Sequence, residues 1–113
     1  MLRREILGNV VSTTINVALT NVGTSISLLN GTTFPTGATA PFVIVIDRGT
    51  INEEKILVAS RSANTLTVSS RGYDGTPAVA HANAATVDHV LDATTIQDMN
   101  TTVYDTELLL WVN

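Results

Sequence analysis

Both histidines of this 113-residue chain lie close in sequence to three aspartates, a combination that could bind a metal ion. His81 and His89 are accompanied by Asp74, Asp88 and Asp92. The histidines are eight residues apart, without the H-x-H or H-x-x-x-H spacing that brings two ligands together, and a metal ion needs three or four convergent ligands. We therefore expect no metal and no cofactor, with His81 packed in a turn and His89 on the polar face of a strand.

Three other groupings resemble parts of enzyme active sites. Ser70 and His81 could act as nucleophile and base, but Ser70 lies in no G-x-S-x-G turn. Residues 72–76 contain two glycines without the G-x-x-x-x-G-K-[ST] pattern of a phosphate loop. Glu53 and Glu54 are adjacent, so on a strand they point to opposite faces and cannot act on one glycosidic bond. The sequence predicts no catalytic residue and no enzymatic activity.

The composition argues against several kinds of partner. Only 14% of the residues are charged, the net charge is −4, and the six basic residues form no cluster of the kind that binds nucleic acid. No apolar run approaches the ~20 residues that cross a bilayer, and Arg3-Arg4 precedes no uninterrupted apolar segment of a signal peptide. The chain has no cysteine, which excludes disulfides and thiol catalysis. We expect neither nucleic acid nor a membrane as partner.

The elements that position these residues are expected to be short strands. Thr13–Thr20 alternates, with Ile15, Val17 and Leu19 on one side, as in a half-buried strand. Phe42–Asp47 is a continuous apolar run, typical of a strand buried on both faces. Further strands are predicted at Ser25–Leu29, in a hairpin over Glu53–Ser70 with Arg61–Asn64 as its connection, and in the alternating Thr86–Val90. The expected fold is mainly β, a small β-sandwich or barrel-like domain of short antiparallel strands with a C-terminal helix or helical turn.

The ends of the chain divide it into an N-terminal arm (1–12), a β-rich domain (13–92) and a C-terminal helix with an apolar tail (93–113). The spacing of Leu2, Ile6 and Val10 fits two helical turns, or equally an extended arm that docks on a neighbouring subunit. Thr94-Thr95 precede Gln97 and Asp98 at a spacing that predicts a helix start. The helix is expected to end near Asn100, and the following segment is either helix or a last strand.

The apolar tail contains the only tryptophan, and burying each such side chain gains about 1.5–3 kcal/mol. The tail must therefore pack on its own core or on another subunit, and we expect the subunit contact because chain termini usually lie at the surface. The predicted interface residues at the two ends of the chain are Leu2, Ile6, Ile96, Met99, Val103, Leu110 and Trp111.

The stretch between the hairpin and the C-terminal element, residues 71–90, is expected to be a structural crossover. Arg71 is placed to bridge a carboxylate, Asp74 to cap a turn, and Gly72 and Gly75 to adopt positive φ. The small-residue run Ala78–Ala85 permits a close approach of backbones, either within the monomer or at an interface. The predicted structural-turn residues are Arg71, Gly72, Asp74, Gly75, His81 and His89.

These segments resemble a module common in the structural proteins of tailed bacteriophages. Its recurring form is P-F-x-(apolar)-D, then E-x-(apolar)-V, N-T-L-T-V, R-G-x-D-G-T-x-A-x-A-H and V-x-H. The corresponding segments are Pro41–Asp47, Glu54–Val58, Asn64–Val68, Arg71–His81 and Val87–His89. The resemblance covers about Asn16–Asn100, including an upstream lead-in at Thr24–Gly37. The chain departs from the pattern at Ala84-Ala85, where the module usually has a glycine.

The resemblance implies a non-enzymatic virion protein, since such modules occur in fibre and minor tail proteins and in small decoration-like proteins. No long fibre segment follows, so we expect a complete small protein or a trimmed one. It would act as capsid decoration (cement) or as a small head-neck-tail adaptor or fibre, assembled in the host bacterial cytoplasm. Its partners would be copies of itself, as a trimer, and major capsid, neck or tail proteins. The alternative is a glycan-binding module for host attachment, with Tyr73 as its stacking platform.

Overall fold

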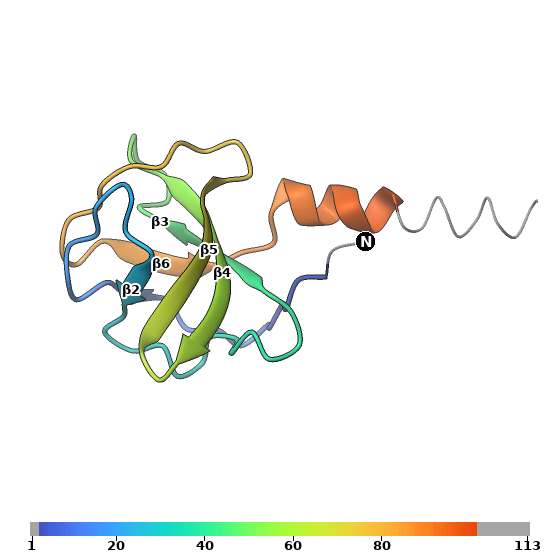
Figure 1. Ribbon diagram of the computed structural model, residues 1–113, viewed down its shortest axis with the longest axis horizontal. Coiled ribbons are helices and arrows are strands. Elements are labelled where there is room, and N and C mark those ends of the chain that lie inside the picture. Colours follow the sequence, from blue (N-terminus) through green and yellow to red (C-terminus); the bar gives the residue numbers. More distant parts are fainter. Residues whose placement is uncertain (1–2, 102–113) are drawn as a thin grey trace, which may run out of the picture.

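The computed structural model describes residues 3–101, which form a mainly β domain with one short helix (Figure 1). Six strands lie in one antiparallel sheet in the order β1-β6-β3-β4-β5-β2. The strands are β1 (Thr13–Thr14), β2 (Ser25–Ser27), β3 (Phe42–Ile46), β4 (Glu54–Ser62), β5 (Thr65–Tyr73) and β6 (Thr86–His89).

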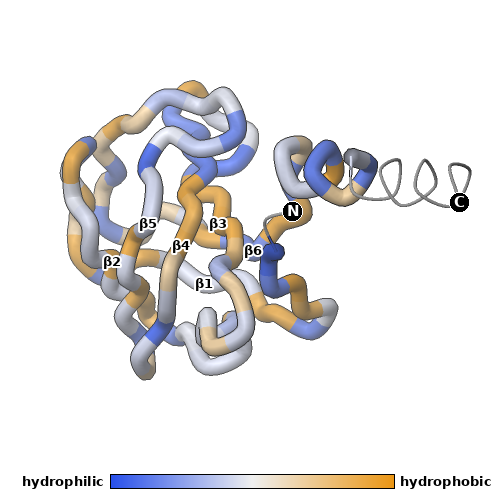
Figure 2. Tube along the Cα trace, turned by 45° about the vertical axis from the view of Figure 1, so that its right-hand side comes forward, coloured by the Kyte–Doolittle hydropathy of each residue, from blue (hydrophilic) through white to orange (hydrophobic). Residues whose placement is uncertain are grey.

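Strand β3 lies inside the sheet, between β6 and β4, and all five of its residues are buried. Phe42, Ile44 and Ile46 belong to the hydrophobic core, while Val43 and Val45 alternate to the opposite face and are also buried. The prediction of a strand buried on both faces is thus confirmed. The segment is coloured as hydrophobic in Figure 2.

The predicted hairpin is present, but its connection is shorter than the sequence indicated. Arg61 pairs with Leu66 and Ser62 pairs with Thr65, so the loop contains only Ala63 and Asn64 instead of Arg61–Asn64. The Arg61 side chain is held in the ladder because it donates hydrogen bonds to the carbonyls of Phe34, Pro35 and Ala63. Ala63 adopts a φ of 52°, which closes the tight turn.

The sheet curls until its two edge strands meet, which makes the fold barrel-like instead of a sandwich of two sheets. Ile15, directly after β1, forms an antiparallel bridge with Leu28, directly after β2. Both side chains are buried at 1% exposure.

The prediction of one strand over Thr13–Thr20 is wrong. The regular strand ends at Thr14, and the chain bends before Leu19 forms a separate bridge with His81. Ile15 and Leu19 are buried, but Val17 between them is 61% exposed because the bend removes it from the alternation. Strand β2 is likewise shorter than Ser25–Leu29, and Leu29 is exposed.

The helix over residues 93–101 has its N-cap two residues before the predicted signal at Thr94-Thr95. Asp92, not Thr94 or Thr95, is the N-cap, because its carboxylate accepts the Thr95 amide at 3.0 Å and the Thr95 hydroxyl at 2.6 Å. Residues 93–101 are helical up to the last described residue, so the predicted end near Asn100 cannot be compared with a helix end within the described residues. Leu2, Val103, Leu110 and Trp111 lie outside the described residues.

Residues 3–12 form an extended segment without helical turns, which agrees with the extended alternative. The segment lies on its own domain. The Glu5 amide donates to the Pro41 carbonyl at 2.8 Å, and the Val11 amide donates to the Thr33 hydroxyl at 2.8 Å. In Figure 1 the segment, in dark blue, runs up to the helix.

Candidate functional site

The centre of the candidate site is Glu54, the first residue of β4, whose side chain is completely buried. Its carboxylate accepts five hydrogen bonds. Oε2 receives Arg71 Nε and the Gly72 amide, each at 2.8 Å. Oε1 receives Arg71 Nη2 at 2.8 Å, His81 Nε2 at 2.9 Å and the Val79 amide at 3.1 Å. A buried carboxylate with this many donors is compensated for the loss of water.

Arg71, in β5, is the bridging residue that the sequence predicted, and Glu54 is its partner. Beyond the two bonds to the carboxylate, its guanidinium donates to the carbonyls of Thr20 (2.7 Å), Gly23 (2.8 Å) and Val79 (2.8 Å). One side chain therefore joins the hairpin to the connection between β1 and β2 and to the loop before β6. The planar fork of arginine suits such simultaneous contacts.

His81 lies between two carboxylates and is 2% exposed. Its Nδ1 is 2.8 Å from Asp47 Oδ2, and its Nε2 is 2.9 Å from Glu54 Oε1. Both ring nitrogens are therefore within hydrogen-bond distance of a carboxylate oxygen. His81 is thus a buried residue of the crossover, but it lies in a β-bridge with Leu19 and not in a turn as predicted. It also bridges two acids, which the sequence did not indicate.

The pKa of Glu54 reflects these donors. Burial raises the pKa, but the hydrogen bonds from Arg71, Gly72, His81 and Val79 outweigh burial and lower it to about 2. Glu54 is therefore a carboxylate at neutral pH. It has no proton to give as a general acid, and its lone pairs are already engaged by donors.

The two glycines of the turn adopt the positive φ that the sequence predicted, 57° at Gly72 and 80° at Gly75. At Gly72 a side chain is also excluded by space, because a Cβ would lie 2.9 Å from the Thr76 carbonyl oxygen. The same residue donates its amide to Glu54. Gly72 therefore permits the backbone to approach the buried carboxylate.

Asp74 was predicted to cap a turn. Its side chain instead connects the Gly72–Gly75 turn to the start of the helix. Its carboxylate pairs with Lys55 Nζ at 2.7 Å and accepts the amides of Ala93 (3.3 Å) and Thr94 (2.8 Å) and the Thr94 hydroxyl (2.7 Å). Burial raises the pKa of Asp74, but the bonds from Lys55, Thr94 and Ala93 lower it to about 2. The negative charge lies at the helix N-terminus, where the helix dipole favours it.

His89, in β6, holds the N-terminal segment. Its Nδ1 is 2.9 Å from the Val43 carbonyl, and its Nε2 accepts the Leu7 amide at 3.2 Å. This pairing assigns the proton to Nδ1. The ring packs edge-on against Phe42, with centroids 6.0 Å apart. Burial lowers the pKa of His89, while the Val43 carbonyl and the charge of Glu5 oppose the shift.

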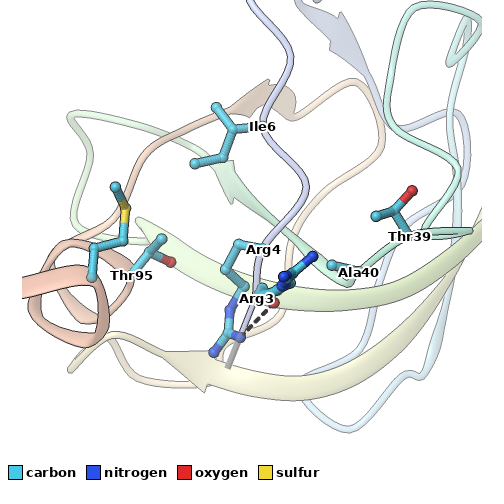
Figure 3. Close-up of a pocket in the computed structure, with 7 residues that line it drawn as sticks. Arg3, Arg4, Ile6, Thr39, Ala40 and Thr95 are labelled. Atoms are coloured by element: carbon cyan, nitrogen blue, oxygen red, sulfur yellow. Dashed lines mark hydrogen bonds between the residues drawn. The ribbon is translucent and has the colours of Figure 1, made fainter. Parts of the chain in front are cut away.

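A surface hollow of about 490 Å³ lies beside the turn, between the N-terminal segment, the loop before β3 and the helix. Figure 3 shows Ile6 above Arg3 and Arg4, with Thr95 on one side and Thr39 and Ala40 on the other. We call this feature the hollow; its lining residues are Arg3, Arg4, Ile6, Thr39, Ala40, Thr95 and Met99.

The groupings that suggested catalysis do not assemble in this structure. The Ser70 hydroxyl contacts the Arg71 carbonyl at 3.4 Å, while both His81 nitrogens are used by carboxylates. Glu53 accepts the Gly49 amide, away from the partners of Glu54. Within residues 3–101, no group of three or more His, Cys, Asp or Glu side chains is arranged to hold a metal ion. The helix among these residues is too short and too polar to cross a membrane.

Three contacts of the candidate site were not predicted from the sequence. These are Glu54 as the partner of Arg71, Asp47 as the partner of His81, and the contact between Arg4 and Tyr73. Arg4 Nη2 donates to the Tyr73 hydroxyl at 2.6 Å, and the guanidinium lies 5.6 Å from the ring centroid. These partners are distant in sequence, and no local pattern links them.

Comparison with models of known protein families and with curated proteins found no match.

Proposed function

We propose that the chain is a non-enzymatic structural subunit of a tailed-phage virion. It would act there as an oligomeric accessory subunit, either capsid decoration or a small head-neck-tail adaptor or fibre. The observation that carries this proposal is the convergence of Arg71, Gly72, Val79 and His81 on the buried Glu54. All four belong to the R-G-x-D-G-T-x-A-x-A-H segment that resembles the phage module. The segment thus specifies a rigid framework, as a structural module requires.

The chemistry of the cluster supports a structural role. Nucleophilic or acid–base catalysis needs a group that reaches a substrate and exchanges a proton with it. Here Glu54 and His81 have no more than 2% exposure, and their polar atoms are bonded to each other, to Arg71, to Asp47 or to backbone amides. These contacts leave them no substrate-facing atom.

The apolar surface near the hollow supports an assembled subunit. Ile6, Ile96 and Met99 were predicted to lie at an interface, and their exposed fractions are 46%, 44% and 46%. Large apolar side chains that gather on one face are typical of contact surfaces. We propose that this face contacts another copy, in a trimer, and that the oligomer binds capsid, neck or tail proteins.

The alternative of a glycan-binding module has less support. Stacking of a sugar requires a free aromatic face, and Tyr73 was the expected platform. The Arg4 guanidinium lies over the Tyr73 ring, and the Tyr73 hydroxyl is bonded to the same side chain. The ring is therefore engaged in holding the N-terminal segment.

Labelling of phage particles would test the proposal. Antibodies raised against the purified chain would be used for gold labelling of intact particles of the phage that encodes it. We expect label at a fixed place on the head, neck or tail, with several copies in each particle. Absence of the chain from washed, intact particles, checked by mass spectrometry of the same sample, would contradict a role in the virion.

A further inference from the structure

We infer that the hollow is the docking site for residues 107–112 of a neighbouring copy of this chain. The inference rests on the proposed function, because an assembled subunit must contact its own copies. It goes further than the proposed function, since it names the hollow as the binding surface and residues 107–112 as the segment that binds there. The volume of about 490 Å³ lies within the ~300–1,000 Å³ that is typical of binding pockets. It therefore has room for several side chains.

The lining of the hollow combines apolar and basic groups. Ile6, Ala40 and Met99 supply apolar surface, and Arg3 and Arg4 supply two positive charges. Neither arginine forms an ion pair with any residue among 3–101. Arg4 Nε has no acceptor among these residues. An occupant with apolar side chains next to an acidic group would complement both features.

The chain itself contains a segment of this composition just after its described part. Residues 108–112 are Leu-Leu-Leu-Trp-Val, and Asp105 and Glu107 precede them. Five consecutive apolar residues are costly to leave in water, since each large side chain gains about 1.5–3 kcal/mol on burial. Glu107 lies within residues 107–112 and Asp105 lies just before them, and both have the sign opposite to that of Arg3 and Arg4. Residues 107–112 are therefore a suitable occupant.

The direction of the helix favours a neighbouring copy over the same copy. In Figure 1 the helix runs outward from the sheet. The hollow is lined by Thr95 and Met99 of the same helix. A segment that continues in the direction of the helix moves away from its own hollow, which favours the hollow of a neighbouring copy. Each copy then gives one segment and receives another, a head-to-tail contact that can close into a ring.

The framework of the turn at Gly72–Gly75 holds both walls of the hollow in place. Tyr73 binds Arg4 of the N-terminal segment. Asp74 binds the amides of Ala93 and Thr94 at the start of the helix. Adjacent residues thus fix the two walls before any occupant arrives, which reduces the ordering cost of binding.

Two complementary full-length variants would test the inference by sedimentation and tryptophan fluorescence. Met99→Glu alters the hollow and leaves the tail unchanged. Leu110→Ser combined with Trp111→Ser alters the tail, leaves the hollow unchanged and removes the only tryptophan. We expect each variant alone to associate about thirtyfold or more weakly than the unmodified chain, as for an interface hot spot.

Mixing the two variants should restore one contact. We expect a complex of one copy of each, because one supplies the tail and the other supplies the hollow. The emission of Trp111, present only in the Met99→Glu copy, should shift to shorter wavelength when the tryptophan-free copy is added. Val22→Glu is the matched control: Val22 is 75% exposed, does not line the hollow, and its replacement should leave association unchanged.

Three results would overturn the inference. The first is no complex and no emission shift on mixing, although circular dichroism shows both variants folded. The second is Trp111 emission in the unmodified monomer that is already at shorter wavelength on dilution, which indicates docking within one copy. The third is unchanged association of the tail variant. None of these results concerns the presence of the chain in particles, so particle labelling separates this inference from the proposed function.

Discussion

Glu54 and Arg71 form a two-point ion pair inside the domain, with Oε2–Nε and Oε1–Nη2 distances both 2.8 Å. The Glu54 side chain has no exposed surface, and the Arg71 side chain is 10% exposed. The pair joins the first residue of β4 to the last part of β5, and Arg71 extends it to the carbonyls of Thr20 and Gly23. The hairpin and the connection between β1 and β2 are thereby held in one arrangement.

Replacement of Glu54 by glutamine should destabilise the domain strongly. The variant leaves the Arg71 charge buried without its partner, a change that typically costs about 3–5 kcal/mol. The adjacent Glu53→Gln is the control, because Glu53 is only partly buried and its amide oxygen can still accept the Gly49 N–H. We expect the control to change the free energy of unfolding by less than about 0.5 kcal/mol. Urea unfolding would measure both, and equal effects would contradict a central role for the pair.

Acid should remove stability in a defined pH range. The pKa of Glu54 is about 2 in the folded protein against an ordinary 4.5, so its contribution is complete above pH 4.5 and is lost as the pH falls towards 2. At about 1.36 kcal/mol for each pKa unit, the loss from Glu54 is about 3 kcal/mol. Asp74, whose pKa is also about 2, acts in the same direction. Unfolding curves at several pH values should show this decline, and a smaller decline in Glu54→Gln.

Alanine at the two glycines of the turn should have unequal effects. Gly75 has a φ of 80° and nothing within 4 Å of an added Cβ, so Gly75→Ala should cost only the left-handed conformation, about 1–2 kcal/mol. Gly72→Ala adds contacts of 2.9 Å and 3.0 Å with backbone atoms of Thr76 and Ala78. We expect it to be more destabilising by at least about 1 kcal/mol, because the backbone must shift away from Glu54. Similar melting temperatures for the two variants would show that the space at Gly72 is unimportant.

Protonation of His89 should loosen the N-terminal segment. Burial lowers the pKa of His89 below its ordinary 6.5 in the folded protein, so its contribution to stability is complete above pH 6.5 and decreases as the pH falls below that value. A protonated Nε2 cannot accept the Leu7 amide. Hydrogen exchange by NMR at pH 7 and pH 5, corrected for intrinsic rates, should show reduced protection of Leu7. The Val11 amide is the internal control, since its acceptor, the Thr33 hydroxyl, does not titrate in this range.

The strands whose signals are local were predictable from the sequence. Phe42–Ile46 is a continuous apolar run, and its five residues are all buried. Thr13–Thr20 was misjudged because its alternation ends where the chain bonds to irregular backbone: Ile15 exchanges hydrogen bonds with Ala84 and Ala85, and Leu19 with His81. Period-2 reasoning assumes a regular partner strand, and this segment has one only at Thr13–Thr14.

Only the part of the candidate site that lies within Arg71–His81 was predictable from the sequence. The glycines, Arg71 and His81 form a recognisable local pattern, and the structure confirms the positive φ at Gly72 and Gly75. Glu54 was not identifiable, because an acidic residue at the start of a strand is usually solvated. Its burial depends on donors that lie 17 to 27 residues further along the chain. Such a partnership is set by tertiary structure and leaves no periodic trace.

The Glu54 carboxylate also determines how long the following loop can be. Arg71 and Gly72 bind the carboxylate before the loop, and Val79 and His81 bind it after the loop. Insertion or deletion of one residue between Gly75 and Val79 would move the returning amide and imidazole away from their acceptor. The spacing between Arg71 and His81 in this chain is therefore set by the carboxylate of Glu54, which lies outside that segment.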